Sequence, residues 1–250
     1  MNVLDFSNLK LAICADYGEV SRVSAGYVLG AVKDKANAVL GLATGSTPVG
    51  MYKEIVFAYK NGGADFSKVT TFNLDEYFPI KNTDSQSYIY FMKENLFGGI
   101  NIDMENVNIP NGEAADAEVE CLWYEEKIKA AGGIDLQVLG IGLNGHIGFN
   151  EPSPYFEAKT HYVSLDESTI KANSRFFESE DLVPRHALSM GVGTIMAAKK
   201  ILLIVTGEAK AEILKETILG KITPEVPASV LQLHQNVTIV ADRDAAKYFL

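Results

Sequence analysis

Short apolar runs recur along the chain, and each is followed by a polar or glycine-containing stretch. The runs have four to seven residues, a length typical of strands rather than of helices. They show little alternation of apolar and polar residues, which is typical of strands buried on both faces of a parallel sheet. The predicted strands are residues 9–15, 38–42, 69–74, 136–141, 201–205 and 237–240.

Between these runs, apolar residues recur at spacings of three and four, which predicts amphipathic helices. The predicted helices are residues 20–32, 49–59, 87–95, 115–131, 192–198 and 209–219. Strands that alternate with helices indicate an α/β fold, with a mainly parallel sheet flanked by helices. Neither an internal repeat nor a long linker divides the chain, so we expect one domain over residues 1–250.

Residues 155–186 are more polar and less regular than the rest of the chain. Such a segment is either a small lid over a site or an ordinary surface excursion, and its composition fits both.

Composition narrows the classes of partner. The chain has 250 residues and a formal net charge of −10, which disfavours nucleic acid and anionic membrane surfaces. An anionic small ligand would need a local positive site. The two cysteines, Cys14 and Cys121, are expected to be reduced and buried. With no secretory signal and no apolar run near the roughly 18 residues that span a bilayer, we expect a cytoplasmic protein without a membrane segment.

The segment 142–152 carries the strongest chemical signal. It follows the predicted strand 136–141 and places Asn144, His146 and Glu151 among three glycines. A histidine with a nearby carboxylate, on a loop tied to a buried strand, suits general acid–base chemistry. The alternative is a structural loop histidine beside an acid that caps a helix.

The segment 41–48 has the composition of a phosphate site. It joins a predicted strand to a predicted helix, and Gly45, Ser46 and Thr47 combine a small residue with two hydroxyl groups. Free N–H groups at a helix N-terminus and the helix dipole favour an anion there. The alternative is a tight turn in which Thr47 caps the helix.

Three further positions have charged side chains that could serve a site. Asp75 and Glu76 follow the strand 69–74 and could be a general base and its neighbour, or a cap or solvated turn. Arg175 could bind a phosphate with its forked guanidinium, or lie on the surface between aromatic residues. Lys210 begins a predicted helix, where a cation is unfavourable unless an anion binds beside it.

Taken together, these segments resemble the glucosamine-6-phosphate deaminase (isomerising) family along essentially the whole chain. The matching stretches are residues 44–48, 71–77, 145–152, 173–177, 191–194 and 207–210. Each is weak alone, but their order and spacing are specific. The resemblance implies a Rossmann-like fold and a hydrolase of amino-sugar catabolism, which converts glucosamine 6-phosphate and water into fructose 6-phosphate and ammonia. It implies no metal and no organic cofactor.

The resemblance also implies roles for individual residues. His146 would assist opening of the sugar ring, and Glu151 would orient His146. Asp75 would take the proton from C2 and deliver it to C1. The phosphate would be held by Gly45, Ser46, Thr47, Arg175 and Lys210. Glu76 would be a neighbour in the substrate site.

One departure from the family pattern lies beside the histidine. Many members have aspartate where this chain has Asn144. An asparagine can still orient His146 by hydrogen bonding, but it cannot stabilise an imidazolium by charge.

A second departure concerns regulation. Hexameric relatives are activated by N-acetylglucosamine 6-phosphate, which they bind with a serine, an arginine and a lysine. The matching positions here are Pro154, His161 and Val163. Because the charges that would bind the phosphate are missing, we predict a non-allosteric enzyme that is a monomer or a small homo-oligomer.

Three other functions remain as alternatives. A deaminase of galactosamine 6-phosphate would differ only in the orientation of one substrate hydroxyl. A 6-phosphogluconolactonase would share the fold and the phosphate site but lacks the paired motifs at 73–77 and 149–152. A non-catalytic sugar-phosphate sensor is disfavoured because Asp75, His146 and Glu151 are all present.

Overall fold

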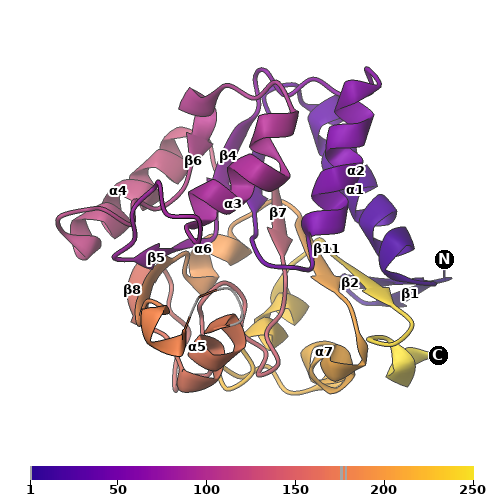
Figure 1. The fold of residues 1–250 in the computed structure, drawn as a ribbon. Helices are drawn as coiled ribbons and strands as arrows, with labels where there is room; N and C mark the ends of the chain where they lie inside the picture. Colours follow the sequence, from indigo (N-terminus) through magenta and orange to yellow (C-terminus); the bar gives the residue numbers. More distant parts are fainter. Residues whose placement is uncertain (1, 175–176, 178) are drawn as a thin grey trace.

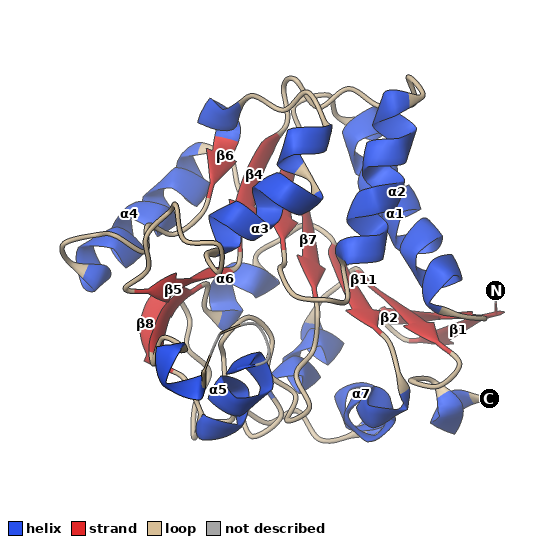
Figure 2. Ribbon diagram, in the orientation of Figure 1, coloured by secondary structure: helices blue, strands red, loops and turns tan. Residues whose placement is uncertain are grey.

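The computed structural model describes residues 2–174, 177 and 179–250. In these residues one large sheet has the strand order β1-β2-β11-β10-β7-β3-β4-β6 (Figures 1 and 2). All neighbours in it are parallel except β1 and β2, which form an antiparallel pair at one edge. The strands are β1 (Asn2–Phe6), β2 (Leu9–Cys14), β3 (Val39–Leu42), β4 (Thr70–Asn73), β6 (Val107–Asn108), β7 (Leu136–Leu139), β10 (Ile201–Val205) and β11 (Val237–Asp242).

Helices cover both faces of this sheet. On one face, α1 (Tyr17–Asp34), α2 (Val49–Lys60) and α3 (Tyr88–Asn95) pack on buried strand residues such as Leu40 and Val138. On the other face, α4 (Ala117–Ala130), α6 (Val192–Met196) and α7 (Ala211–Leu219) pack on residues such as Phe72 and Leu203. A sheet buried on both sides explains why its strands are almost wholly apolar.

A small antiparallel sheet with the order β5-β9-β8 lies beside the large one. Its strands are β5 (Asp75–Phe78), β8 (His161–Ser164) and β9 (His186–Ser189). Figure 1 shows it between α4 and the short helix α5 (Glu167–Asn173). Tyr77 from β5, Phe149 and Ile170 from α5 share a third cluster of buried residues. This cluster joins the first residues after β4 to the segment expected to be a lid.

Among the described residues, every 3-10 helix is a single turn apart from one. They are η1 (Phe97–Gly99), η2 (Met104–Asn106), η4 (Glu180–Leu182), η5 (Glu208–Lys210), η6 (Pro227–Leu233) and η7 (Lys247–Phe249).

The predicted α/β fold with a mainly parallel sheet is confirmed. All six predicted strands and all six predicted helices are present, and their ends differ from the predicted ends by no more than three residues. The strands β1, β5, β6, β8 and β9 and the helix α5 were not predicted. They are short, and β1 and β8 alternate between exposed and half-buried residues instead of forming apolar runs.

Four neighbouring strands of the large sheet determine where the site lies. The order β10-β7-β3-β4 is continuous, and these four strands are mutually parallel. Their carboxyl ends therefore meet at one edge of the sheet. From β3 the chain continues outward to β4, whereas from β10 it continues to β11 on the opposite side. Ligands of open α/β sheets bind at such a change of direction, outside the carboxyl ends of the strands.

Candidate active site

Each of the four neighbouring strands leads into one of the segments with candidate chemistry. β3 leads to Gly45, Ser46 and Thr47, β4 leads to Asp75, β7 leads to His146, and β10 leads to Lys210. The sequence placed these segments up to 165 residues apart, and the sheet brings them to one edge. Arg175 lies outside the described residues, so its expected phosphate contact stays a prediction.

The loop after β7 is shaped by its glycines. Gly145 and Gly148 have φ angles of +88° and +58°, which favour glycine. The ring of His146 occupies the space that a Cβ atom at Gly142 would need, so the loop folds back over its own start. At Gly148 a Cβ atom would lie 3.6 Å from Oδ2 of Asp75. The histidine loop and the Asp75 carboxylate are therefore in direct proximity.

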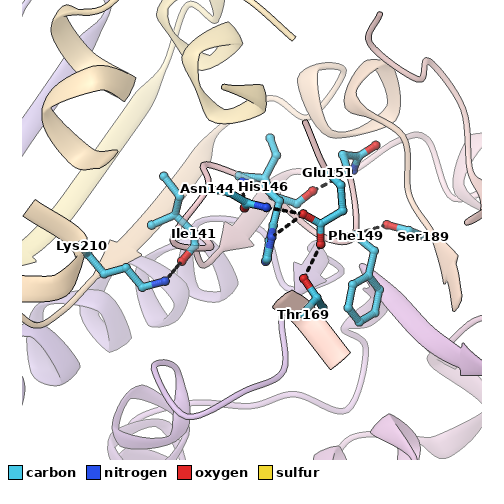
Figure 3. Close-up of polar contacts among 10 residues, drawn as sticks. Ile141, Asn144, His146, Phe149, Glu151, Thr169, Ser189 and Lys210 are labelled. Carbon is cyan, nitrogen blue, oxygen red and sulfur yellow. Dashed lines mark hydrogen bonds and ion pairs between the residues drawn. The ribbon is translucent and has the colours of Figure 1, made fainter. Parts of the chain in front are cut away.

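Glu151 is the centre of a hydrogen-bond network (Figure 3). Its Oε2 lies 3.1 Å from Nδ1 of His146 and accepts a 2.6 Å bond from Nδ2 of Asn144, while Oε1 accepts a 2.5 Å bond from the hydroxyl of Thr169. The Glu151 side chain is 7% exposed. Burial raises the pKa of Glu151, but the bonds from His146, Thr169 and Asn144 and the charge of His146 outweigh it, so this pKa lies below its ordinary value.

Asn144 was expected to orient His146 by hydrogen bonding. In the structure the amide nitrogen donates to Glu151, and Oδ1 accepts a 3.2 Å bond from the backbone N–H of His146. Asn144 thus holds the carboxylate and the loop backbone, and it acts on the imidazole through Glu151.

The side chain of Asp75 is buried in surroundings that disfavour the charged carboxylate. The residue is 7% exposed. Burial, followed by the negative charge of Glu76, raises the pKa of Asp75 to about 8. A carboxyl group with its pKa near neutrality is suited to both taking and returning a proton.

The side chains of β9 attach the histidine loop to the small sheet. Asp75 pairs with Ser189 across β5 and β9, and the Ser189 hydroxyl accepts a 3.0 Å bond from the backbone N–H of Phe149. Asn150 donates 2.8 Å bonds to the carbonyls of Ile147 and Met190. Neither Ser189 nor Asn150 was singled out in the sequence, although Asn150 stands next to Glu151.

Glu76 does not face the same way as Asp75. Successive residues of a strand point to opposite faces. The carboxylate of Glu76 is fully buried and accepts hydrogen bonds from the backbone N–H groups of Tyr77, Tyr88 and Ile89 at 2.9–3.1 Å. Burial raises the pKa of Glu76 to about 7 even though these donors lower it. Glu76 therefore holds the N-terminus of α3, and its expected place in the substrate site stays a prediction.

Tyr17, the first residue of α1, supports the segment that follows β3. Its hydroxyl lies 3.2 and 3.1 Å from the carbonyls of Ser46 and Thr47 and accepts a 2.8 Å bond from the N–H of Gly50. Gly45 has a φ angle of +92°. The alternative that Thr47 caps the helix is wrong, because Pro48 is the N-cap of α2 and makes no capping hydrogen bond, whereas the Gly50 N–H is bound by Tyr17.

Lys210 reaches from the β10 side of the sheet to the β7 side. Its Nζ donates a 2.7 Å bond to the carbonyl of Ile141, directly before the histidine loop (Figure 3). The preceding Gly207 has a φ angle of +88°, and its N–H donates to both carboxylate oxygens of Asp242 at 2.9 and 3.1 Å. A positive charge is thus fixed at the carboxyl edge of the sheet.

The histidines outside the loop serve the fold. His234 is buried and bonds through Nε2 to the carbonyl of Ala198 at 2.7 Å, and the ring of His186 stacks on Tyr162. Among residues 2–174, 177 and 179–250, no group of three or more His, Cys, Asp or Glu side chains is arranged to hold a metal ion. No helix in these ranges is long and apolar enough to cross a membrane.

Comparison with known proteins gives one consistent match. The family described as "Glucosamine-6-phosphate isomerases/6-phosphogluconolactonase" matches residues 19–240. The chain is 57% identical over 238 residues to a protein named glucosamine-6-phosphate deaminase from Clostridium novyi (strain NT), covering 95% of this chain and 99% of that protein. It is 58% identical to the protein of the same name from Thermoanaerobacter sp. (strain X514), covering 95% and 94%.

A solved structure gives the same result in three dimensions. The protein is described as a monomeric glucosamine-6-phosphate deaminase and is 43% identical to this chain. The two superpose with a TM-score of 0.93, over 95% of this chain and 98% of the other.

Proposed function

Because the chain belongs to the glucosamine-6-phosphate isomerase/6-phosphogluconolactonase family, we infer that it is a glucosamine-6-phosphate deaminase. It converts D-glucosamine 6-phosphate and water into D-fructose 6-phosphate and ammonia. The observation that carries this conclusion is the identity of 57–58% to proteins named as this deaminase, over 95% of the chain.

We propose that His146 opens the sugar ring, with Glu151 as its partner. The carboxylate next to Nδ1 fixes the orientation of the imidazole and stabilises its protonated form, so that Nε2 is directed to the ring oxygen and the C1 hydroxyl. The hydrogen bonds from Asn144 and Thr169 keep Glu151 ionised. Ring opening produces the aldehyde at C1 that the next step requires.

Asp75 is then the base that moves the proton from C2 to C1. Its raised pKa means that the ligand-free protein holds this carboxyl largely protonated at neutral pH. The substrate has an ammonium group on C2, and a cation beside Asp75 favours the carboxylate. Binding of the substrate would therefore produce the base at the carbon where it is needed. Removal of the C2 proton gives the 1,2-enolamine, and protonation at C1 converts it into an iminium at C2. Water adds to C2, the C–N bond breaks, and ammonia leaves behind the C2 ketone of fructose 6-phosphate.

The phosphate of the substrate would be held at the same carboxyl edge of the sheet, by groups other than His146 and Asp75. Gly45, Ser46 and Thr47 stand before the N-terminus of α2, and Lys210 supplies a fixed positive charge. Arg175 completes this proposed set. The phosphate is remote from C1 and C2, so its binding energy positions the reacting carbons. We propose one domain over residues 1–250, in which residues 155–186 cover the bound sugar.

The test measures ammonia and fructose 6-phosphate released from glucosamine 6-phosphate by the wild type, Asp75→Asn and His146→Gln. We expect both products in equal amounts from the wild type, and losses in kcat on the order of 10²- to 10⁴-fold for Asp75→Asn. Asp244→Asn, at an exposed position, is the matched control and should keep wild-type turnover. Binding of the sugar without release of ammonia would instead identify a sensor.

Two related activities are separated by their substrates. Galactosamine 6-phosphate differs at C4, and we expect kcat/KM for it to be lower than for glucosamine 6-phosphate. Hydrolysis of 6-phosphogluconolactone without release of ammonia from the amino sugar would contradict the assignment.

A further inference from the structure

The outer face of α4 is apolar although it faces solvent. Val119, Leu122 and Trp123 are 49, 60 and 66% exposed. Their spacing of three and four places them side by side on the helix. The opposite face of α4 is also apolar, because Cys121, Tyr124 and Ile128 are buried, and Tyr124 and Ile128 belong to the core cluster of the large sheet. The helix therefore has more apolar surface than its packing on the sheet requires.

Single exposed apolar residues are normal on a soluble protein, but a contiguous group that includes Trp is typical of an interaction site. Trp123 is the only tryptophan of the chain. Figure 1 shows α4 at the outer edge of the molecule, away from α7 and the chain ends. Another molecule can therefore approach this face.

We propose that the outer face of α4 binds the same face of a second copy of the chain, with the two helices antiparallel. The charges along the helix favour this occupant. The first turn is acidic, with Asp116, Glu118 and Glu120, and the last turn is basic, with Lys127 and Lys129. A two-fold axis between Leu122 and Trp123 places the two lysines of one copy level with the acidic turn of the other. A parallel arrangement would place acid against acid.

Local contacts fix this charge pattern. Asp116 accepts bonds from the N–H groups of Glu118 and Val119, and Glu120 accepts a 3.0 Å bond from the N–H of Asn111. Glu126 shares the outer face and pairs with Lys129 of its own helix at 4.0 Å. The protein as a whole has a net charge of −10, which opposes association, so the paired ends of α4 would have to offset this repulsion locally.

The proposed contact is small. One helix from each copy stays below the roughly 1,200 Å² of total buried area that characterises stable complexes, which places it among weak, reversible interfaces. Within it, Trp123 would bury the largest side chain and is expected to contribute most. We therefore expect a concentration-dependent equilibrium between monomer and dimer.

The first experiment uses Trp123 as the probe. Its emission maximum should move to shorter wavelength as the protein concentration is raised, in parallel with dimer formation in sedimentation equilibrium. Trp123→Arg should raise the dissociation constant tenfold or more and leave kcat/KM unchanged. Phe57→Arg is the matched control, because Phe57 is an equally exposed aromatic residue on α2, at 67%. A protein that stays monomeric at all concentrations, or that responds equally to both substitutions, overturns the proposal.

A second experiment tests the antiparallel arrangement. Lys129→Glu should weaken the dimer at least several-fold, and the double variant Glu118→Lys, Lys129→Glu should restore it. Both keep Trp123, so the same fluorescence measurement applies. Failure of the double variant to regain association, with its fold intact by circular dichroism, overturns the antiparallel pairing.

Discussion

The hydroxyl of Thr169 donates a 2.5 Å hydrogen bond to Oε1 of Glu151, and this bond joins α5 to the proposed ring-opening pair. Thr169 is 6% exposed and belongs to the segment 155–186 that we expect to cover the sugar. The N-cap of the same helix, Asp166, has a raised pKa because of burial and the nearby charge of Glu151. α5 is thus in electrostatic and hydrogen-bonding contact with the centre of the site.

Thr169→Val removes this bond while keeping the shape of the side chain. A hydrogen bond to a charged group contributes about 1.5–3 kcal/mol, and about 1.4 kcal/mol is a factor of ten in rate. We expect kcat/KM to fall roughly tenfold or more. Because the bond favours the ionised form of Glu151, its loss should raise the pKa of Glu151 and move the acid limb of the pH–rate profile to higher pH.

Thr169→Ser is the control for that variant, since it keeps the hydroxyl. It should retain most of the activity and the wild-type acid limb. If both variants lose activity equally and neither changes the pH profile, Thr169 has only a packing role.

Glu76→Gln separates a structural role of this residue from substrate binding. A glutamine leaves one oxygen to accept from the α3 backbone and turns an NH₂ group toward other N–H groups, which costs about 1–3 kcal/mol of unfolding free energy. We expect the thermal midpoint to fall by several degrees at roughly 2–4 °C per kcal/mol, while KM stays within about twofold. An increase of tenfold in KM with an unchanged midpoint would return Glu76 to the substrate site.

The predicted lack of allosteric control can be measured directly. The positions that correspond to the activator site are Pro154, His161 and Val163, and of these only His161 is titratable. In the structure Nδ1 of His161 lies 3.0 Å from the carbonyl of Lys159. We expect a hyperbolic dependence of rate on glucosamine 6-phosphate, with no change when N-acetylglucosamine 6-phosphate is added. A sigmoidal curve that becomes hyperbolic with this compound would show that the prediction is wrong.

Much of the fold could be predicted because buried parallel strands form apolar runs that are easily recognised in the sequence. The order of β10, β7, β3 and β4 in the sheet could not be read from the runs themselves, and it is this order that assembles the site. The short strand β5 illustrates the limit. Its residues alternate between Asp75, which faces the histidine loop, and Glu76, which binds α3, and a pair of adjacent acids gives no sign of this division.

The residues that hydrogen-bond to the predicted site residues were the hardest to predict from the sequence. Glu151 and Thr169 are 18 residues apart, one in the loop after β7 and the other in α5, so no sequence pattern links them. Tyr17 lies about 30 residues before the loop that it supports. Such contacts depend on how α1 and α5 pack, which is decided by the whole core. Motif spacing therefore predicts the charged and hydroxyl groups of the candidate site, whereas the residues that orient them depend on the three-dimensional packing.

The buried acids give the ligand-free protein a specific dependence of stability on pH. The pKa of Asp75 is about 8 and that of Glu76 about 7 in the folded state, whereas unfolded Asp and Glu have values of about 4. Between these limits the folded protein binds more protons than the unfolded protein. The contribution of these groups to the unfolding free energy should therefore be highest below about pH 4 and fall as the pH rises toward 8, by up to about 1.4 kcal/mol per pH unit for each proton.

Asp75→Asn tests this linkage, because it removes one of the two titrating groups. Urea unfolding at pH 5, 6.5 and 8 should give a clearly shallower decline for the variant than for the wild type, with a difference on the order of a few kcal/mol at pH 8. Asp135→Asn is the control of opposite sign. Bonds from Lys199, Lys35 and the Val39 N–H outweigh burial and lower the pKa of Asp135 to about 2, so its stabilisation is complete above about pH 4. That variant should lose a constant amount of stability from pH 5 to 8, whereas equal slopes for wild type and Asp75→Asn would exclude a raised pKa at Asp75.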